Sequence, residues 1–565
     1  MAKKAAQKIT KSMEETLWDS ANKLRGTVES SEYKHVVLGL IFLKFASDKF
    51  EERRAELIAE GKEKYLEMKE FYNMKNVFFL APESRWSHVM ENSKQDQIAL
   101  IVDTALHTIE KNNPSLKGAL PDNYFSRLAM DPSKLAALLD TINNIDTVGD
   151  KEEDVVGRIY EYFLGRFAAA EGKGGGEFYT PKSIVNLIAE MLEPYKGKIY
   201  DPCCGSGGMF VQSIKFVQSH QGNTKDISIY GQEFTAVTYK LAKMNLAIRG
   251  IAANLGEVPA NTFFRDQHPD LKADFILANP PFNQSQWREK NELEDDPRWS
   301  GFTTPPTGNA NYAWMLHMLS KLSENGTAGF VMANGSMSSN TSGEGDIRRE
   351  LVEKDLVDCM IALPGQLFYT TQIPVCLWFV TKNKASTSSA SGRSFRDRRG
   401  ETLFIDARQL GTMIDRTQKE LTKEDIELIA STYHNWRNAP SIPTPSISLK
   451  GEDGNVIAPA RRGGSDEGAK QSQSPNEKDG RAPLAMTKAY EDVPGFCKSA
   501  TLSEIAANDY VLTPGRYVGI AEEEDNGEIF EEKMSELTAA FKSQLAQAKE
   551  LDLAILENLK GLGYE

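Results

Sequence analysis

A short motif, Asn279-Pro280-Pro281-Phe282, places an amide and an aromatic side chain directly after an apolar run. The run, residues 275–277, is of the kind that lies buried in a parallel sheet. Two consecutive prolines end such a strand, because proline cannot donate a backbone hydrogen bond and its φ angle is fixed. The sequence therefore predicts Asn279 at the carboxyl end of a buried strand, where open α/β sheets bind ligands, with Phe282 exposed on the loop that follows.

The motif resembles the catalytic motif of methyltransferases that act on the exocyclic amine of adenine. The lone pair of that amine is delocalised into the ring, so the nitrogen is a poor nucleophile. The resemblance implies that the side-chain oxygen of Asn279 and the carbonyl of Pro280 accept the two amino hydrogens, which stabilises the positive charge that grows on nitrogen. Phe282 would stack on the flipped base, a contact worth roughly 1–3 kcal/mol. As a bare pattern, the motif is also compatible with a strand that ends in a proline-rich turn.

A second motif, Asp201-Pro202-Cys203-Cys204-Gly205-Ser206-Gly207-Gly208, follows a predicted strand at residues 198–201 and precedes an apolar helix at residues 209–217. A strand, a glycine-rich turn and a helix N-terminus form the layout of a nucleotide-cofactor site. The spacing differs from the dinucleotide fingerprint, whose glycines admit a pyrophosphate. S-adenosylmethionine has no phosphate, and the carboxylate of Asp201 suits its cationic amino group and sulfonium. The glycines let the backbone approach the cofactor without an intervening Cβ.

Two further carboxylates are predicted at the next strand ends. Glu233 ends a strand at residues 227–233, where a carboxylate can accept both ribose hydroxyls of the cofactor. Asp266 ends a strand at residues 261–266 and is expected to bind the adenine amine of the cofactor. A single acid at a strand end is usually a solvated cap, but three at successive strand ends before Asn279 indicate a cofactor site.

A glycine-rich segment, residues 171–182, reads EGKGGGEFYTPK and precedes the first strand of the sheet. Four glycines in five residues make a hinge that could close over a ligand. Thr180 is expected to cap the helix at residues 183–192, with Pro181 at the first helical position. The alternative interpretation is a flexible linker before a capped helix.

In this order, the motifs resemble the amino-methyltransferases whose cofactor motifs precede the catalytic one. A long helical N-terminal region narrows the resemblance to the modification (M, HsdM-type) subunit of type I restriction–modification systems, which are N6-adenine DNA methyltransferases. Residues 308–314, GNANYAW, are also similar to that family, and the similarity is clearest over residues 12–382. The cofactor contacts that it implies, together with those argued above, are Glu177, Phe178, Tyr179, Thr180, Pro181, Lys182, Asp201, Gly205, Ser206, Gly207, Gly208, Glu233 and Asp266. The adjacent pair Cys203 and Cys204 departs from the small residues that often occur there.

The expected fold class is α/β, a Rossmann-like S-adenosylmethionine-dependent methyltransferase sheet with a helical N-terminal domain and a long C-terminal helix. The expected domains are a helical domain at residues 1–168, the catalytic domain at 169–448, a low-complexity segment at 449–500 and a tail at 501–565. The later strands of the sheet are expected at residues 327–333, 357–363 and 375–381, with the sheet closing near residue 381.

Three segments are candidates for contact with other molecules. Apolar residues recur at steps of three and four over residues 530–562, which predicts one long helix whose stripe docks on a partner helix. Residues 283–310 are expected to be a substrate-side loop that orders on DNA. The Ser/Arg-rich segment 384–399 is expected to be a solvated loop, and its basic residues are the best local alternative for a phosphate contact.

The chain of 565 residues carries a net charge of −14. Because nucleic-acid binding depends on Lys and Arg neutralising phosphates, an acidic chain is expected to act with a more basic partner. The resemblance implies double-stranded DNA, a DNA-specificity (S) subunit, a second M subunit and a restriction/translocase (R) subunit as partners. Neither a membrane span nor a metal site is expected. The cysteines show no CxxC spacing and no pairing with histidine, so we expect the protein in the reducing cytoplasm.

The sequence therefore predicts a site-specific DNA adenine N6-methyltransferase, the methylation subunit of a type I complex that protects host DNA from cleavage. Because no base-reading module is evident, the chain alone is not expected to choose its DNA sequence. One alternative is a methyltransferase for glutamine side chains or RNA amines, although these usually carry Tyr as the last motif residue and lack the large helical domain. Another is a catalytically silent scaffold, against which the intact Asn279 and Phe282 argue.

Overall fold

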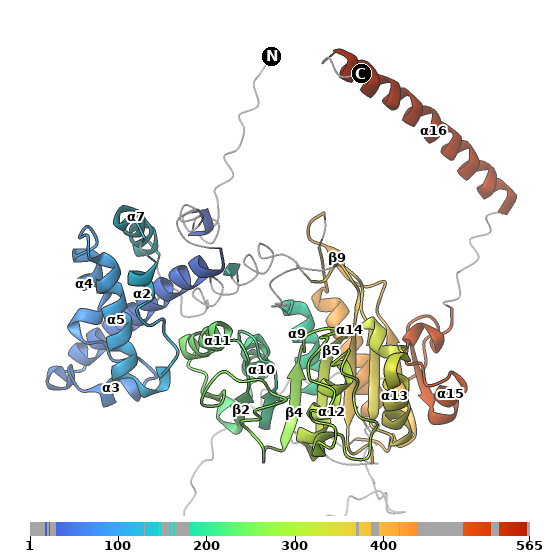
Figure 1. The fold of residues 1–565 in the computed structure, drawn as a ribbon, viewed down its shortest axis with the longest axis horizontal. Helices are drawn as coiled ribbons and strands as arrows, with labels where there is room; N and C mark the ends of the chain where they lie inside the picture. Colours follow the sequence, from blue (N-terminus) through green and yellow to red (C-terminus); the bar gives the residue numbers. More distant parts are fainter. Residues whose placement is uncertain are drawn as a thin grey trace, which may run out of the picture. The chain divides into compact units, whose positions relative to one another are not determined.

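The computed structural model describes residues 17–19, 22, 30–128, 130–145, 147, 159, 162–163, 180–368, 372–385, 395–416, 418–438, 490–520 and 530–561. The chain divides into two compact units, Met1–Val518 and Gly519–Glu565. The larger unit holds a cluster of helices and an α/β sheet, and the described residues from 530 onward in the smaller one form one long helix (Figure 1).

The N-terminal part of the larger unit is helical, as predicted. Its helices are α2 (Ser30–Ala59), α3 (Lys69–Asn73), α4 (Trp86–Glu91), α5 (Ile98–Asn112), α6 (Tyr124–Arg127) and α7 (Pro132–Asn143). Val36, Leu40 and Ile41 of α2 are fully buried in one apolar cluster. Met244, from a helix of the sheet region, packs in the same cluster, so this helical part is joined to the sheet through apolar contacts.

The sheet has nine strands in the order β11-β8-β6-β7-β5-β4-β1-β2-β3. They are β1 (Gly197–Asp201), β2 (Ile227–Gly231), β3 (Ala253–Asn254), β4 (Ala273–Ala278), β5 (Leu322–Ala333), β6 (Val357–Ala362), β7 (Val375–Thr381), β8 (Glu401–Asp406) and β11 (Cys497–Thr501). β7 runs antiparallel between β5 and β6, β11 runs antiparallel to β8, and the other neighbouring strands are parallel. The predicted α/β class is confirmed.

Side chains alternate between the two faces of the sheet, and helices cover both faces (Figure 1). On one face, Leu277 packs in an apolar layer with α9 (Lys182–Leu192), α10 (Gly208–Ser219), α11 (Ala236–Ile248) and α14 (Lys423–Arg437). On the other face, its neighbours Ile276 and Ala278 pack with α12 (Asn311–Lys321), α13 (Glu344–Glu353) and α15 (Leu502–Ala507). Burial of both faces explains why the central strands are uninterrupted apolar runs.

The order of the strands reverses between β1 and β4. From β1 the chain continues outward through β2 and β3, and it then returns to place β4 on the other side of β1. The register aligns Tyr200 with Ile276, so the residues that follow β1 and β4 leave the sheet at the same edge. In open α/β sheets this switch point is where ligands bind.

The sheet extends beyond residue 381, so the expectation that it closes there is wrong. β8 lies beside β6, and all five residues of β11 pair with β8. The following residues also pack on this unit, since the ring of Tyr517 stacks on Phe404 at 3.8 Å between centroids. The C-terminal unit therefore begins at Gly519 rather than at residue 501. A small hairpin of β9 (Thr412–Met413) and β10 (Lys419–Glu420) follows β8.

The C-terminal unit contains α16 (Phe530–Gly561), a helix of 32 residues that confirms the prediction of one long helix. Within its unit, the apolar stripe is open to solvent. The side chains of Met534, Leu537, Phe541, Leu545, Leu551, Ile555 and Leu556 are between 46% and 65% exposed. Among the described residues, no helix has the length and apolarity needed to cross a bilayer.

Candidate active site

The amide of Asn279 lies directly after β4 and makes one hydrogen bond. Its Nδ2 donates to the hydroxyl oxygen of Thr180 at 3.0 Å. Its Oδ1 is buried and has no hydrogen-bond partner within the part of the chain that the structure describes. Because unpartnered buried acceptors are uncommon in folded proteins, this oxygen marks a position where a donor from a ligand would fit.

The residues of the motif that follow Asn279 are packed into the fold to different degrees. Pro280 is buried, whereas Phe282 is only partly buried and packs against the apolar layer of the sheet. The ring of Phe282 lies 6.0 Å from that of Phe368, edge to face at 74°. The expectation of an exposed Phe282 is thus wrong, because its ring is partly buried beside Phe368 of the loop after β6.

The predicted glycine turn connects β1 to α10 in the expected way. Gly205 and Gly207 have φ angles of +54° and +80°, which residues with a Cβ adopt only with strain. A Cβ at Gly205 or Gly208 would meet no atom within 4 Å, so these glycines border open space. The carbonyl of Ser206 accepts a hydrogen bond of 2.8 Å from Nδ2 of Asn245 in α11. The sequence offered no signal for Asn245, whose role depends on this contact between distant segments.

Two of the predicted carboxylates, Glu233 and Asp201, lie beside the turn. Glu233 accepts from the backbone N–H of Gly205 at 3.1 Å and from that of Thr235 at 2.7 Å. Asp201 is 1% exposed and accepts from the N–H of Cys203 at 3.0 Å. Burial raises the pKa of Asp201 to about 7, and the negative charge of Glu233 adds to that rise. The structure thus concentrates negative charge next to a backbone cradle, which favours a cationic ligand.

Asp266 lies in irregular structure after a turn at residues 262–264, since residues 261–266 form no strand and the expectation of one is wrong. One carboxylate oxygen pairs with the buried ammonium of Lys321, and the other accepts from the N–H of His268 at 2.9 Å. Burial raises the pKa of Asp266, but Lys321 and the His268 N–H more than offset this and hold it below its ordinary value. The predicted contact with the adenine amine stays a prediction, with both oxygens already engaged.

The glycine-rich segment before α9 is described only from Thr180 onward, so Glu177, Phe178 and Tyr179 lie outside the described residues. Helix α9 starts at Lys182 with Pro181 at the cap position, and no side chain caps it. The expectation that Thr180 caps this helix is wrong, because its hydroxyl oxygen accepts from Asn279 instead. Pro181 is buried and Lys182 is exposed.

Two exposed phenylalanines near these carboxylates were not predicted. Phe234, directly after Glu233, is 69% exposed, and Phe264 is 48% exposed. The backbone N–H of Ala260 donates to the carbonyl of Glu233 at 2.9 Å, which brings the two segments together. An aromatic residue immediately after an acidic strand end was the available signal, because a flat purine ring needs an apolar surface as well as hydrogen bonds.

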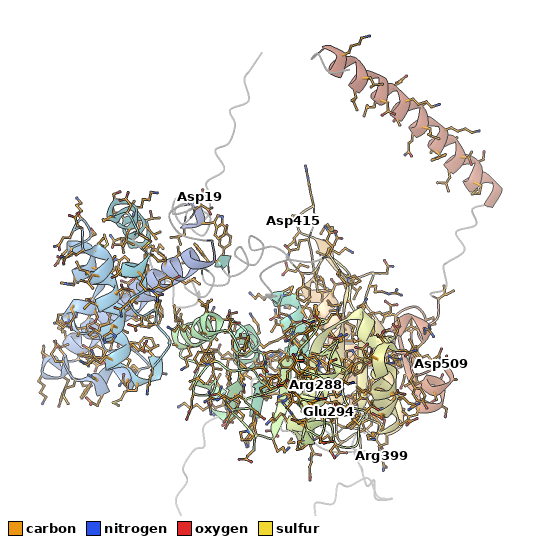
Figure 2. The ribbon with its side chains drawn as sticks, in the orientation of Figure 1. Asp19, Arg288, Glu294, Arg399, Asp415 and Asp509 are labelled. Carbon is orange, nitrogen blue, oxygen red and sulfur yellow. The ribbon has the colours of Figure 1, made fainter. Side chains whose placement is uncertain are left out.

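Residues 283–310 are held by contacts within the chain, whereas the sequence predicted that DNA orders them. The guanidinium of Arg288, labelled in Figure 2, is 8% exposed and donates to four backbone carbonyls of the segment. The indole N–H of Trp287 donates to the carbonyl of Pro306 at 2.7 Å. The backbone N–H of Asn283 donates to Oδ1 of Asn311 at 2.9 Å, which ties the start of the segment to α12. The guanidinium of Arg288 thus satisfies backbone carbonyls that backbone N–H groups would pair with in a helix or a strand.

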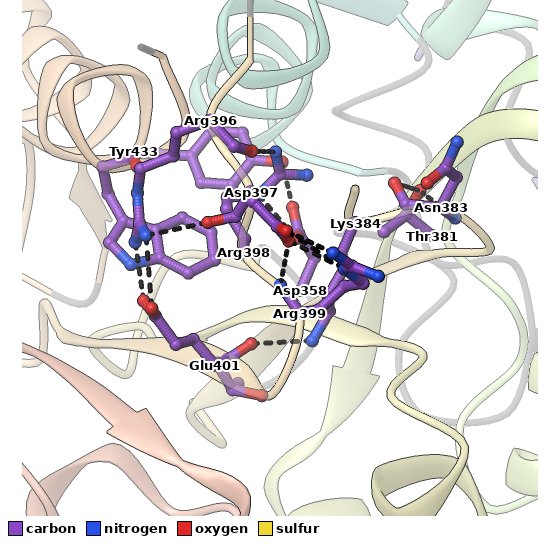
Figure 3. Close-up of polar contacts among 12 residues, drawn as sticks. Asp358, Thr381, Asn383, Lys384, Arg396, Asp397, Arg398, Arg399, Glu401 and Tyr433 are labelled. Carbon is purple, nitrogen blue, oxygen red and sulfur yellow. Dashed lines mark hydrogen bonds and ion pairs between the residues drawn. The ribbon is translucent and has the colours of Figure 1, made fainter. Parts of the chain in front are cut away.

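The basic residues after β7 form internal ion pairs, as Figure 3 shows. Arg398 pairs with Asp358 at 3.2 Å, and their side chains are only 3% and 1% exposed. Lys384 pairs with Asp355 at 2.6 Å and is equally buried. Arg399 pairs with Asp397 at 2.6 Å at the surface. The expectation of a phosphate contact is therefore wrong for Lys384 and Arg398, because both charges are already compensated inside the fold.

The hydroxyl of Tyr433 completes the buried cluster by donating to Asp358 at 2.7 Å. Burial alone raises the pKa of Asp358, but the charges of Arg398 and Lys384 outweigh it and hold that pKa below its ordinary value. This cluster joins β6, the loop after β7 and α14 through buried ion pairs and a hydrogen bond.

The fold is that of the α/β S-adenosylmethionine-dependent methyltransferases, with the candidate site at the switch point of the sheet. Comparison with known families gives two matches: N-6 DNA Methylase over residues 151–526 and the HsdM N-terminal domain over residues 13–144. The chain belongs to the N-6 DNA methylase family and is an HsdM-type modification subunit.

Individual relatives agree with this assignment. The type I restriction enzyme HindI methylase subunit of Haemophilus influenzae is 46% identical over 477 residues, which cover 83% of this chain and 93% of that protein. The MjaIX methylase subunit of Methanocaldococcus jannaschii is 37% identical, with coverage of 98% and 92%. The solved type I methyltransferase subunit of Streptococcus thermophilus has the same fold, with a TM-score of 0.68 at 24% identity and coverage of 90% and 99%.

Proposed function

We propose that this chain transfers a methyl group from S-adenosylmethionine to the 6-amino group of a flipped adenine in double-stranded DNA, within a type I restriction–modification complex. The observation that carries the proposal is the buried, unpartnered Oδ1 of Asn279 at the switch point of the sheet. Leaving a buried acceptor unpaired costs roughly 1–3 kcal/mol. Such a cost is offset when a substrate supplies the missing donor, and the adenine amine is a donor of the right kind.

The catalytic work assigned to Asn279 and Pro280 is acceptance of the two amino hydrogens, by the amide oxygen and the backbone carbonyl. This draws the nitrogen lone pair out of conjugation and stabilises the positive charge that develops during attack. The acceptors are fixed before the substrate arrives, because two prolines stiffen the loop. Phe282, braced by Phe368, provides a ring face for the flipped base. Pro281 completes the motif by fixing the backbone between these groups.

The residues around the glycine turn fit S-adenosylmethionine, which supplies an electrophilic methyl group on a sulfonium. Glu233, which accepts from the N–H of Gly205, is assigned to the ribose hydroxyls, and Asp201, which accepts from the N–H of Cys203, to the cationic end. Gly205, Ser206, Gly207 and Gly208 are assigned as the backbone cradle of the cofactor. Phe234 and Phe264 offer apolar surface to the adenine ring of the cofactor. Asp266 is assigned to the amine of that ring. The resemblance adds residues 177–182 as further cofactor contacts. Together these groups bind and orient the donor and exclude water from the reacting atoms.

The partner of the exposed stripe on α16 is assigned as the DNA-specificity subunit. The stripe leaves seven large apolar side chains open within its own unit, an arrangement typical of a surface that is covered in a complex. A second modification subunit and the restriction/translocase subunit complete the proposed complex. The chain's charge of −14 supports a division of labour in which other subunits hold most of the DNA backbone.

The proposed compartment is the cytoplasm, where the five free thiols would stay reduced.

The proposal is tested by methyl transfer from tritiated S-adenosylmethionine to DNA in the assembled complex. Asn279→Ala should lower the rate on the order of a hundred- to a thousandfold, as loss of one group in a preorganised charge-stabilising site does. Cofactor affinity should be unchanged. Asn383→Ala is the matched control, because this side-chain amide lies after the carboxyl end of β7 and donates its hydrogen bond to Asn325. Survival of methyl transfer within about tenfold in Asn279→Ala would overturn the assignment.

A further inference from the structure

The two ends of the Asn279 side chain have the same shape but opposite hydrogen-bonding character. The oxygen accepts hydrogen bonds and the NH2 group donates them. Rotating the amide by half a turn would present a donor to the substrate amine, which is itself a donor, and the stabilisation of developing charge would be lost. Catalysis by Asn279 therefore requires a second group that holds the amide in one orientation.

The structure contains a candidate for such a group at 3.0 Å, the hydroxyl oxygen of Thr180, which accepts from Nδ2 of Asn279 in the observed orientation. Because a hydroxyl can also donate, this bond restrains the amide, and the substrate amine, which is itself a donor, selects the orientation with Oδ1 facing it. With Nδ2 engaged there, Oδ1 is left as the buried acceptor without a partner among the described residues. The two residues lie 99 positions apart, so the contact depends on the tertiary fold.

The position of Thr180 is itself well restrained. It precedes Pro181, and a residue before proline is confined to extended conformations. The carbonyl of Pro181 accepts from the N–H groups of Ile184 and Val185 at 3.0 and 3.2 Å, which fixes this point to the first turn of α9. Both Ile184 and Val185 are buried against the sheet. The hydroxyl is therefore held by a packed helix rather than by a free loop.

The hydroxyl is also not needed to stabilise that helix. The N-terminus of α9 has no side-chain cap, and Thr180 lies one residue outside the cap position. Within the described part of the chain, its recorded hydrogen bond is the one to Asn279. Removing the hydroxyl would thus alter the amide of Asn279 without uncapping α9.

From this geometry we infer that Thr180 is a positioning residue for catalysis, whose hydroxyl holds the Asn279 amide with its oxygen toward the substrate amine. The inference rests on the proposed function and adds to it a role for Thr180 distinct from cofactor contact. Thr180 touches neither reacting atom in this role, and it acts through Asn279.

The test compares Thr180→Val, which keeps the shape but removes the hydroxyl, with Thr180→Ser, which keeps the hydroxyl. In the assembled complex, Thr180→Val should lower kcat by about five- to tenfold, the equivalent of one net hydrogen bond, with KM for DNA within about twofold. Thr180→Ser should recover most of that loss. Thr381→Val is the matched control, because it removes a buried hydroxyl that donates to Gly326 at 3.0 Å in another part of the sheet; its kcat should be unchanged.

A double-mutant cycle separates this role from a cofactor role. If Thr180 acts through Asn279, Thr180→Val should change kcat by less than about twofold in the Asn279→Ala background, because the group that it positions is gone. Calorimetric titration should show that any change of S-adenosylmethionine affinity in Thr180→Val is too small to account for the loss of kcat, which is measured at saturating cofactor. An equal loss of kcat in both backgrounds, or a weaker cofactor affinity that accounts for the whole loss, would overturn the inference. Retention of activity by Asn279→Ala would instead overturn the proposed function, so the two failures are distinguishable.

Discussion

Arg398 and Arg399 are adjacent in sequence, but replacing each by Met should have very different consequences. The guanidinium of Arg398 is buried beside the carboxylate of Asp358, whereas that of Arg399 is 69% exposed and pairs with Asp397 at the surface. Removing one partner of a buried ion pair leaves an uncompensated charge, which costs about 3–5 kcal/mol. Asp358 keeps a hydrogen bond from Tyr433, so we expect the lower end of that range, about 3 kcal/mol.

The matched variant Arg399→Met should cost no more than about 1 kcal/mol, because exposed ion pairs contribute little. Urea unfolding followed by circular dichroism measures both variants under the same conditions. With a urea slope of about 3 kcal/mol per molar for a unit of this size, the Arg398→Met midpoint should fall by about 1 M. Replacing the stranded carboxylate as well, in Arg398→Met with Asp358→Asn, should recover part of the loss.

The effect of pH has a definite sign in the Arg398→Met variant. Without the guanidinium, the folded-state pKa of Asp358 should rise from its lowered value, because burial is then opposed by Lys384 and Tyr433 without Arg398. The extra destabilisation of the variant is fully present above that pKa and shrinks as the pH falls through it. The deficit relative to the parent protein should accordingly be smaller at about pH 4 than at pH 7. Equal midpoints for the two Met variants would refute this reasoning. So would normal stability of Arg398→Met with a shallower salt dependence of DNA binding, which a phosphate contact would give.

Three further predictions concern the cofactor and the tail. Glu233→Gln should weaken S-adenosylmethionine binding by about 1.5–3 kcal/mol in a calorimetric titration, the usual value for hydrogen bonds to a charged group, and unchanged affinity would point to another carboxylate. Because the pKa of Asp201 is raised to about 7, its attraction for a cation is present above that pH and lost below it. The Asp201 contribution to cofactor affinity should then be about tenfold smaller at pH 6 than at pH 8, and Asp201→Asn should remove that difference. A chain that ends at Val518 should keep its cofactor affinity but fail to co-purify with a specificity subunit, and retained assembly would exclude α16 as the docking face.

The sequence by itself determined the local elements that build the site. Apolar runs ended by two prolines or by a glycine turn fix β4, β1 and the start of α10, because these signals act over a few residues. The nine-turn apolar stripe likewise specified α16, since helical periodicity is a local property. The order of the motifs was enough to predict the class of enzyme that the comparisons confirm.

Only the tertiary structure decided which of the charged and polar residues are used for folding. Asp266 and Arg398 look available in the sequence, but each meets an opposite charge from a distant segment, and burial makes that pairing obligatory. Strand β11 pairs with β8 although the intervening sequence includes residues 439–489, and no local sequence pattern predicts that these two strands pair. Thr180 reads as a helix cap, yet its hydroxyl bonds to Asn279, because the packing of α9 against the sheet brings together two residues that the chain separates widely.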